Sequence, residues 1–400
     1  MENDLFFFPK KTVQKIDNSS YILNTMECLA QKFDFAFYFI TQNMPKENWK
    51  IVGDFKEYME NLWTDDKNIL TPINFMEKIL YIAKEFFSLK EEIEPYYFYD
   101  FILEKLNKEL NGFDESITKY YNDFFEKAKE DQNKKDKEAQ NMMEKDIKNK
   151  DDKGDENEDY KEDNFQKYLE VYIKENNSIV SKTFYGIIKI IEKCDYCREI
   201  NNIKYVNFNF INIDIKGLCN YTNYEKSKFL LEECIQYYFD DSGKIKTEKR
   251  YMCKECGKEY QRTIERKIAQ LPNYLVFRID WGKFKQDKGF ECNITEIPAV
   301  KPSYDCLKIK ETIEIKKNYF NDIAYNHNRI KFLDKKNSIK FKLFSSINYY
   351  NDDKIFITKY RIKEKGNNNW YNFWCNGAGI EKKEYIDDFS VPCLLFYEKI

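Results

Sequence analysis

Four cysteines have the spacing of a metal site. They form two C-x-x-C pairs, Cys194 with Cys197 and Cys253 with Cys256, and Gly257 directly follows the second pair. Two thiolates three positions apart on a tight turn can bind one ion at about 2.3 Å, and a second pair completes a tetrahedron. Since no ligand position remains for water, the pattern predicts a structural zinc site. The alternatives are four incidental cysteines or a redox pair.

The composition is that of an intracellular protein. Eleven cysteines, an odd number, favour free thiols and metal ligands in a reducing compartment over disulfides. The segment from Met1 to Pro9 has acidic residues before a short apolar run, unlike a signal peptide. No apolar stretch is long enough to span a membrane. A net charge of -3 gives no overall attraction to nucleic acid. We therefore expect a cytoplasmic or nuclear protein without membrane contact.

The first 125 residues carry helical periodicity, which predicts helices that face a core. One stripe comprises Phe75, Ile79, Ile82, Ala83, Phe86 and Phe87, and another comprises Phe98, Ile102 and Leu106. From about residue 128 to residue 166 the composition changes to Lys, Asp, Glu, Asn and Gln. Such a segment buries too little apolar surface to offset its chain entropy, so we expect a disordered charged insertion.

After Ile179 the period changes to that of strands. Val206, Phe208 and Phe210 alternate with polar residues, and Ile211, Ile213 and Ile215 then alternate in the opposite phase. Such a slip predicts a bulge or a strand break. Leu275, Phe277, Ile279 and Trp281 predict a further strand, and Val391 to Tyr397 a last, buried one. Residues 198–252, between the cysteine pairs, fit two long strands and a helix. The fold class is therefore α+β, with helices first and an antiparallel sheet after them.

Several motifs around the second cysteine pair follow one another in a fixed order. They are Leu231 to Ile235 with Tyr237, then Cys253 to Cys256, then Arg266 to Ile268, and Leu271-Pro272 before Leu275 to Phe277. In kind and order these segments resemble the ubiquitin-specific protease family. The resemblance implies one papain-like α+β domain. Residues 1–190 would form its helical thumb, with the insertion at about 128–166. Residues 191–400 would form zinc-braced β fingers and a β palm.

The same resemblance implies that the catalytic triad is lost. Ser20 stands where the family has its nucleophilic cysteine, and Lys15 stands where it has the asparagine that supports the oxyanion. Phe356 replaces the histidine. The orienting aspartate should follow the W-Y-x-F pattern at Trp370, but Cys375 stands there instead.

The chemistry points the same way, because a serine or cysteine nucleophile needs a positioned base. The only histidine is His327, which lies 29 residues before Phe356 in a polar stretch typical of a loop. Cys28 falls inside the helix that Ser20 begins, at a position suited to packing. We therefore expect no catalytic residue and no cofactor other than structural zinc.

Among the inactive branches of the family, residues Cys256 to Pro272 and the ending Val391 to Tyr397 resemble the pseudo-hydrolase domain of the Pan poly(A)-nuclease catalytic subunit. That subunit has a β-propeller before this domain and an exonuclease after it. Neither fits in this chain, so the resemblance implies the middle domain alone, without nuclease activity.

The leading hypothesis is therefore a pseudo-deubiquitinase scaffold that binds protein partners, with ubiquitin or a messenger-RNA decay assembly as the candidates. The alternative is a divergent, active cysteine-type deubiquitinase with Cys28 or Cys375 as its reactive thiol. A third hypothesis is a zinc-dependent nucleic-acid module, which the absence of clustered basic charge in the sequence disfavours.

Overall fold

The computed structural model describes residues 12–13, 19–42, 50–64, 69–70, 73–86, 92–120, 122–123, 126, 165–221, 228–239, 251–260, 262–285, 289–291, 307–320, 338–350, 355–364, 367–374, 379–382 and 390–400. Within these ranges the helices come first and most strands follow, as predicted. The helices before residue 190 include α1 (Ser20–Ala30), α2 (Phe33–Thr41), α3 (Val52–Thr64), α4 (Ile73–Ala83), α5 (Pro95–Leu110), α7 (Phe165–Glu175) and α8 (Ile179–Phe184).

Helix α1 lies at the centre of the helical part. Every residue of α1 is buried, because α2 and α5 pack against it on one side and strands of the main sheet on the other. Helix α5 begins with Pro95 at its first turn, where the missing amide hydrogen is tolerated. Its predicted stripe of Phe98, Ile102 and Leu106 is fully buried. The sequence thus identified the core face of α5 correctly.

The first predicted stripe is only partly right. Phe75, Ile79 and Ala83 are buried in α4, but the helix ends at Ala83. Phe86 lies beyond that end and is 55% exposed, with the Lys105 ammonium 4.4 Å from its ring centroid. The apolar periodicity of the sequence therefore continues beyond the C-terminal end of the helix. Phe87 lies outside the described residues.

The main sheet has the strand order β18-β17-β16-β15-β19-β10-β5, and β14 pairs with β15. Its strands are β5 (Ile211–Asp214), β10 (Tyr274–Asp280), β14 (Thr312–Lys316), β15 (Ser338–Tyr350), β16 (Ile355–Glu364), β17 (Asn367–Trp374), β18 (Gly379–Lys382) and β19 (Val391–Lys399). The predicted strands β10 and β19 are both present and buried. All ladders of this sheet are antiparallel except that between β10 and β5, which is parallel.

A second sheet explains that exception. It has the order β4-β3-β9, with β3 (Gly186–Cys194), β4 (Ile200–Phe208) and β9 (Arg262–Gln270). Both β4 and β9 run antiparallel to β3 and hence parallel to one another. They continue into β5 and β10, which therefore also run parallel. A side chain at Gly186 would meet the Phe208 ring and the Gln270 carbonyl oxygen at 2.4 and 2.8 Å, so glycine permits the three strands to meet.

The structure corrects two predictions for the segment between the cysteine pairs. The strand break before Ile211 is present, and Phe208 and Phe210 pack against the core as predicted, but Val206 is 36% exposed and its neighbour Tyr205 is buried instead. Tyr205 faces inward because the rings of Phe165 and Tyr168 pack against it. Where the structure describes this segment, it has one long strand and two helices in place of two long strands and one helix. Its described elements are β4, β5, α9 (Ile215–Tyr221), β6 (Phe229–Leu230), α10 (Leu231–Phe239) and β7 (Tyr251–Met252).

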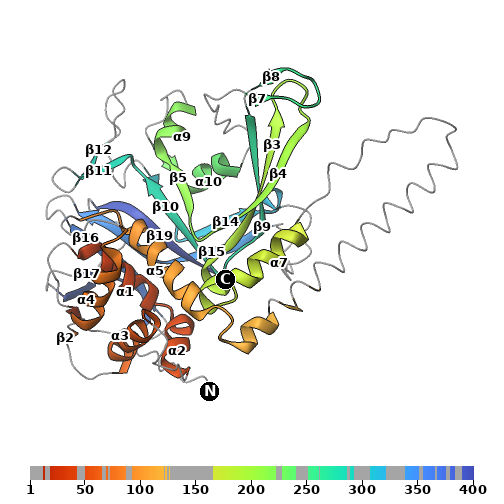
Figure 1. Cartoon of the computed structure of the whole chain (residues 1–400). Coiled ribbons are helices and arrows are strands. Elements are labelled where there is room, and N and C mark those ends of the chain that lie inside the picture. The colour runs from red at the N-terminus through yellow and green to blue at the C-terminus, as the bar shows by residue number, and fades with distance from the viewer. Residues whose placement is uncertain are drawn as a thin grey trace.

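Figure 1 shows how these parts are arranged. Helices α1 to α4 gather at one side of the main sheet, while β3, β4 and β9 extend away from it to β7 and β8 at their far end. The short elements are β1 (Thr12–Val13), β2 (Ile69–Leu70), β8 (Glu259–Tyr260), β11 (Lys283–Lys285), β12 (Gly289–Glu291), β13 (Leu307–Lys308) and the 3-10 helix η2 (Lys317–Tyr319). The predicted charged insertion lies outside the described residues, except that α7 already begins at Phe165. Among the described helices, none is long and apolar enough to cross a membrane.

Candidate functional site

The four predicted metal ligands converge at the far end of the second sheet. Cys194 ends β3, and the second pair lies between β7 and β8. The sulfur atoms of Cys194 and Cys256 lie 3.9 Å apart, and those of Cys197 and Cys253 lie 3.7 Å apart. All four sulfur atoms lie within 4.8 Å of one another. Zinc–sulfur bonds of about 2.3 Å in a tetrahedron place the sulfurs about 3.8 Å apart, so the spacing fits one four-coordinate ion.

The two cysteine turns have the same backbone geometry. In the first, the Arg198 amide donates to the Cys194 carbonyl at 3.0 Å, and in the second the Gly257 amide donates to the Cys253 carbonyl at 3.0 Å. Both Arg198 and Gly257 have a φ of 65°. This left-handed conformation is easy for glycine and strained for arginine. The sequence pointed to Gly257 but gave no sign that Arg198 adopts the equivalent backbone.

Charge also suits a cation at this position. Backbone hydrogen bonds, first from Cys256, lower the pKa of the Cys253 thiol to about 6. The pKa of Cys197 is raised to about 12: a backbone hydrogen bond from Glu199 lowers it, but desolvation and hydrogen bonds with the other three thiols outweigh that effect. Four thiols this close cannot all ionise without a cation between them. The cluster could therefore bind a metal, and its chemistry is that of a zinc site.

The second candidate site lies where α1 meets the main sheet. Ser20 is the first residue of α1 and is fully buried. The Phe356 amide donates a hydrogen bond of 3.2 Å to the Ser20 hydroxyl oxygen. The structure thus brings together two of the three predicted triad positions, which are 336 residues apart in sequence. Cys375, Lys15 and His327 lie outside the described residues.

The backbone of Phe356 joins β16 to α1. On the sheet, Phe356 pairs with Tyr349 of β15. Its carbonyl accepts a hydrogen bond of 2.7 Å from the Asn24 amide, and Asn24 accepts one of 2.8 Å from the Thr358 hydroxyl. Asn24 thus joins α1 to β16, a role that the sequence did not indicate.

The Phe356 side chain is packed as a core residue. It is fully buried, and its ring centroid lies 5.1 Å from that of Tyr349 and 5.4 Å from that of Phe284. Aromatic rings at these separations stabilise one another in addition to burying area. The position that the resemblance assigns to the histidine therefore holds an apolar side chain, which can neither accept nor donate a proton.

Cys28 lies one helical turn beyond Asn24 and is fully buried. Its sulfur atom lies 3.0 Å from the Ser345 hydroxyl and 4.0 Å from the Thr358 hydroxyl. Burial raises the pKa of this thiol well above its usual value, although both hydroxyls lower it. The thiolate is the nucleophilic form of cysteine, so Cys28 has the properties of a packing residue.

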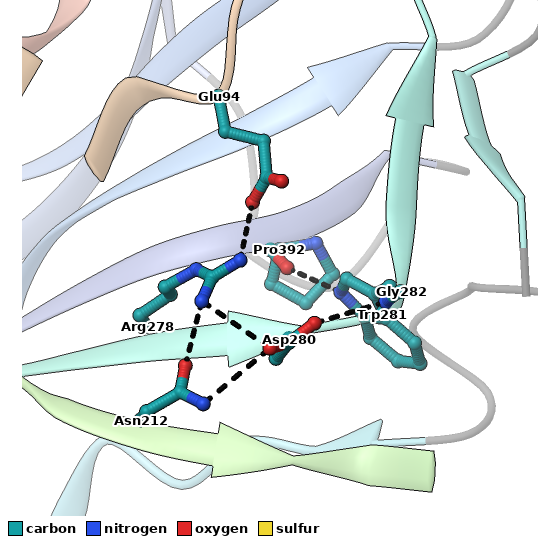
Figure 2. A network of polar contacts seen from close by, with 7 residues as sticks. All are labelled: Glu94, Asn212, Arg278, Asp280, Trp281, Gly282 and Pro392. Carbon is teal, nitrogen blue, oxygen red and sulfur yellow. Dashed lines mark hydrogen bonds and ion pairs between the residues drawn. The ribbon is translucent and has the colours of Figure 1, made fainter. Parts of the chain in front are cut away.

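Glu92 and Glu94, just before α5, contribute to this region and were not found from the sequence. The Glu92 carboxylate accepts hydrogen bonds from the Ser20 and Tyr21 amides at 3.1 and 3.4 Å. Glu94 forms an ion pair of 3.1 Å with Arg278 of β10, as Figure 2 shows. The partners are 71 to 184 residues apart, and no local pattern reveals such a contact.

Comparisons with known proteins were made on the sequence and on the fold. No curated protein matches the sequence. The fold resembles the yeast SAGA DUB module with a mutant Sgf73, at 13% identity and a TM-score of 0.58, covering 98% of this chain and 68% of the other. The SAGA Ubp8/Sgf11/Sus1/Sgf73 DUB module bound to ubiquitin aldehyde matches at 15% identity and a TM-score of 0.58, covering 98% and 69%. A variant Ubp8 module bound to monoubiquitin matches at 14% identity and a TM-score of 0.59, with the same coverage.

These structures share the papain-like fold of ubiquitin-specific proteases with this chain, as the sequence predicted. At such low identity the likeness extends to the fold alone. The model of the ubiquitin carboxyl-terminal hydrolase family matches residues 13–397, almost the whole chain. The chain belongs to the ubiquitin carboxyl-terminal hydrolase family.

Proposed function

We propose that this chain is a non-catalytic member of its family that binds protein partners. The observation that carries the proposal is the direct contact between Ser20 and Phe356, both fully buried. A serine nucleophile needs a base that takes its proton, and a phenylalanine ring cannot do so. The described part of the chain contains no histidine that could serve instead. Together with Cys375 at the third position, these residues mark a degenerate triad.

The second candidate function is a divergent cysteine-type ubiquitin hydrolase. It requires a reactive thiol, and the sequence offers Cys28 and Cys375 for that role. The burial of Cys28 and its raised pKa weigh against the first of these thiols. Cys375 remains the thiol through which this alternative is tested.

We propose that Cys194, Cys197, Cys253 and Cys256 hold one structural zinc ion. Four thiolates complete the coordination of zinc, so the metal has no position for water or substrate. Its contribution would be to fix the ends of β3, β7 and β8 relative to each other. The four retained cysteines and the lost triad are then consistent with one role. The retained residues stabilise the fold, and the lost ones are those that would transfer protons.

For the partners we propose ubiquitin or a messenger-RNA decay assembly. The fold neighbours include modules bound to ubiquitin aldehyde and to monoubiquitin, which supports the first candidate. The resemblance of residues Cys256 to Pro272 to the Pan pseudo-hydrolase domain supports the second. None of the eight described cysteines forms a disulfide, and we propose a cytoplasmic or nuclear location.

The proposed function is tested by turnover of a fluorogenic ubiquitin substrate, with an active family member as positive control. We expect no turnover by the zinc-loaded wild-type chain or by Ser20→Ala. Turnover that Ser20→Ala or Cys375→Ser abolishes would establish the enzyme and overturn the proposal. Titration of labelled ubiquitin, and affinity purification from the native cell with mass spectrometry, then separate the two partner candidates.

A further inference from the structure

Residues 92–96, which we call the strap, connect helix α1 to strand β10. The strap precedes and enters α5, and its two carboxylates belong to Glu92 and Glu94. Both residues are more than nine-tenths buried, with 5% and 9% of their surface exposed. Charged residues are rarely buried to this extent unless they are paired, so each carboxylate should have a defined partner. The partners lie on two different parts of the fold.

The first carboxylate occupies the N-terminus of α1. The opening amides of a helix have no intrahelical acceptor and usually take one from the preceding side chain. The Ser19 side chain makes no such bond. Instead, the Ser20 and Tyr21 amides donate to Glu92 at 3.1 and 3.4 Å, and those of Ile22 and Leu23 donate to the Ser19 carbonyl, both at 3.1 Å. Every amide of this first turn is therefore already bonded.

Glu92 also places negative charge at this end of the helix. Burial, and after it the charge of Glu92, raises the pKa of the Tyr21 hydroxyl well above its usual value. A carboxylate at a helix N-terminus is favoured by the helix dipole. The same charge opposes any second anion there, whether a thiolate at position 20 or the oxyanion of an acyl-transfer reaction.

The second carboxylate, that of Glu94, connects the strap to strand β10 of the main sheet. Glu94 bonds one end of the Arg278 guanidinium at 3.1 Å, and Asp280 and Asn212 bond the other at 3.2 and 3.1 Å (Figure 2). The Tyr96 ring centroid lies 3.8 Å from the centre of the guanidinium. Arg278 is 14% exposed on its side chain, so these partners enclose it. A planar cation with ion pairs at both ends and a ring on its face holds a rigid position.

We propose that the strap is an autoinhibitory element that closes the degenerate site of this chain against acyl substrates. It would do so by placing Glu92 on the amide donors of α1 and by anchoring itself to Arg278 through Glu94. Amide donors beside a nucleophile are the groups that stabilise the oxyanion of acyl transfer. With Glu92 on those donors, restoring the cysteine alone should not restore reactivity. This inference rests on the proposed function, and it adds a second barrier that is independent of the missing base.

The test introduces a thiol with Ser20→Cys and measures its alkylation by iodoacetamide in the folded, zinc-loaded protein at pH 7.5. Peptide mass spectrometry separates the introduced thiol from the natural cysteines. The same background then receives Glu92→Gln, Glu92→Ala or Glu94→Gln. The matched control is Glu104→Gln, which removes a carboxylate from the exposed i,i+4 pair of Glu104 with Lys108 on the same α5. Circular dichroism and the melting temperature verify that each variant is folded.

We expect the introduced thiol to react slowly in Ser20→Cys and in its Glu104→Gln control. Each strap variant should raise the alkylation rate at least tenfold, by removing charge, by opening the site, or both. Should Glu92→Ala fail to fold, Glu92→Gln decides, since it keeps one acceptor at the helix terminus and loses the charge and the second acceptor. Strap variants within twofold of the control would overturn the proposal, as would a Ser20→Cys thiol that already reacts like an exposed cysteine. Neither result depends on ubiquitin turnover, so this inference and the proposed function can fail separately.

Discussion

Replacing Glu27 with glutamine should stabilise the protein at neutral pH. Glu27 lies on α1 and is 1% exposed, and its Oε2 atom is buried without a hydrogen-bond partner among the described residues. Burial raises its pKa from 4.5 to about 8, although the hydrogen bond from Gln31 lowers it. One pKa unit corresponds to about 1.4 kcal/mol, so the raised pKa of Glu27 lowers the free energy of unfolding by about 3 kcal/mol at pH 7 and by about 5 kcal/mol above pH 8.

The sign follows from proton counting. Below pH 4.5 the carboxyl is protonated in both states, and above pH 8 it is ionised in both. Between these values the folded state holds a proton that the unfolded chain has lost, so the free energy of unfolding falls as the pH rises. Glutamine has no such penalty. The stability gained by Glu27→Gln should therefore grow by about 1.4 kcal/mol per pH unit through this window and level off above it.

The assay is urea unfolding of the wild type and of Glu27→Gln at several pH values from 5.5 to 8.5, in zinc-containing buffer. Comparing the two proteins at each pH cancels the other titrating groups, including the cysteines. Glu104→Gln is the control, because it makes the same substitution at a half-exposed carboxylate. A difference between Glu27→Gln and wild type that stays constant from pH 5.5 to 8.5 would refute the reasoning.

Three further predictions follow from the geometry. Elemental analysis of the zinc-loaded protein should find one zinc per chain. Cys256→Ser should lose this metal, and amide hydrogen exchange in β3, β7 and β8 should then become faster. A Cys256→Ser protein that lacks zinc but has the exchange rates of the wild type would contradict this prediction. Arg198→Gly should stabilise the fold by about 0.5 to 1 kcal/mol and Gly257→Ala should destabilise it by about 1 kcal/mol, since both positions have a φ of 65°. If denaturant unfolding shows that both substitutions change the stability in the same direction, the prediction is wrong. Asn24→Ala should destabilise the fold by about 1 to 3 kcal/mol in the same assay, because it removes the amide that donates to the buried Phe356 carbonyl. A loss below about 1 kcal/mol would show that another donor replaces it.

The sequence revealed the features that depend on local patterns. The cysteine spacing identified the four residues that meet in space, since a C-x-x-C turn determines its own geometry. The apolar stripe of α5 and the buried strand β19 were also predicted, because their periods match the core faces. The family resemblance placed Ser20 at the start of a helix and opposite Phe356, and the structure has them in contact.

What the sequence left out depends on tertiary contacts. The burial of Tyr205 on β4 follows from aromatic residues of α7 that pack on it, whereas alternation within β4 alone placed Val206 on the buried face. The parallel pair of β5 and β10 follows from the path of β4 and β9 on either side of β3. Glu92 and Glu94 acquire their roles from partners that are far away in sequence, and nothing adjacent to them in the chain distinguishes them from solvent-exposed charges.

The most direct test of the non-catalytic assignment is the mass of the intact, zinc-loaded protein after incubation with an electrophilic ubiquitin probe. We predict that the wild-type mass does not change, while an active family member in the same experiment gains one ubiquitin. A wild-type adduct of one ubiquitin, mapped to Cys28 or Cys375 and absent after substitution of that cysteine, would contradict the assignment and establish a cysteine-type hydrolase.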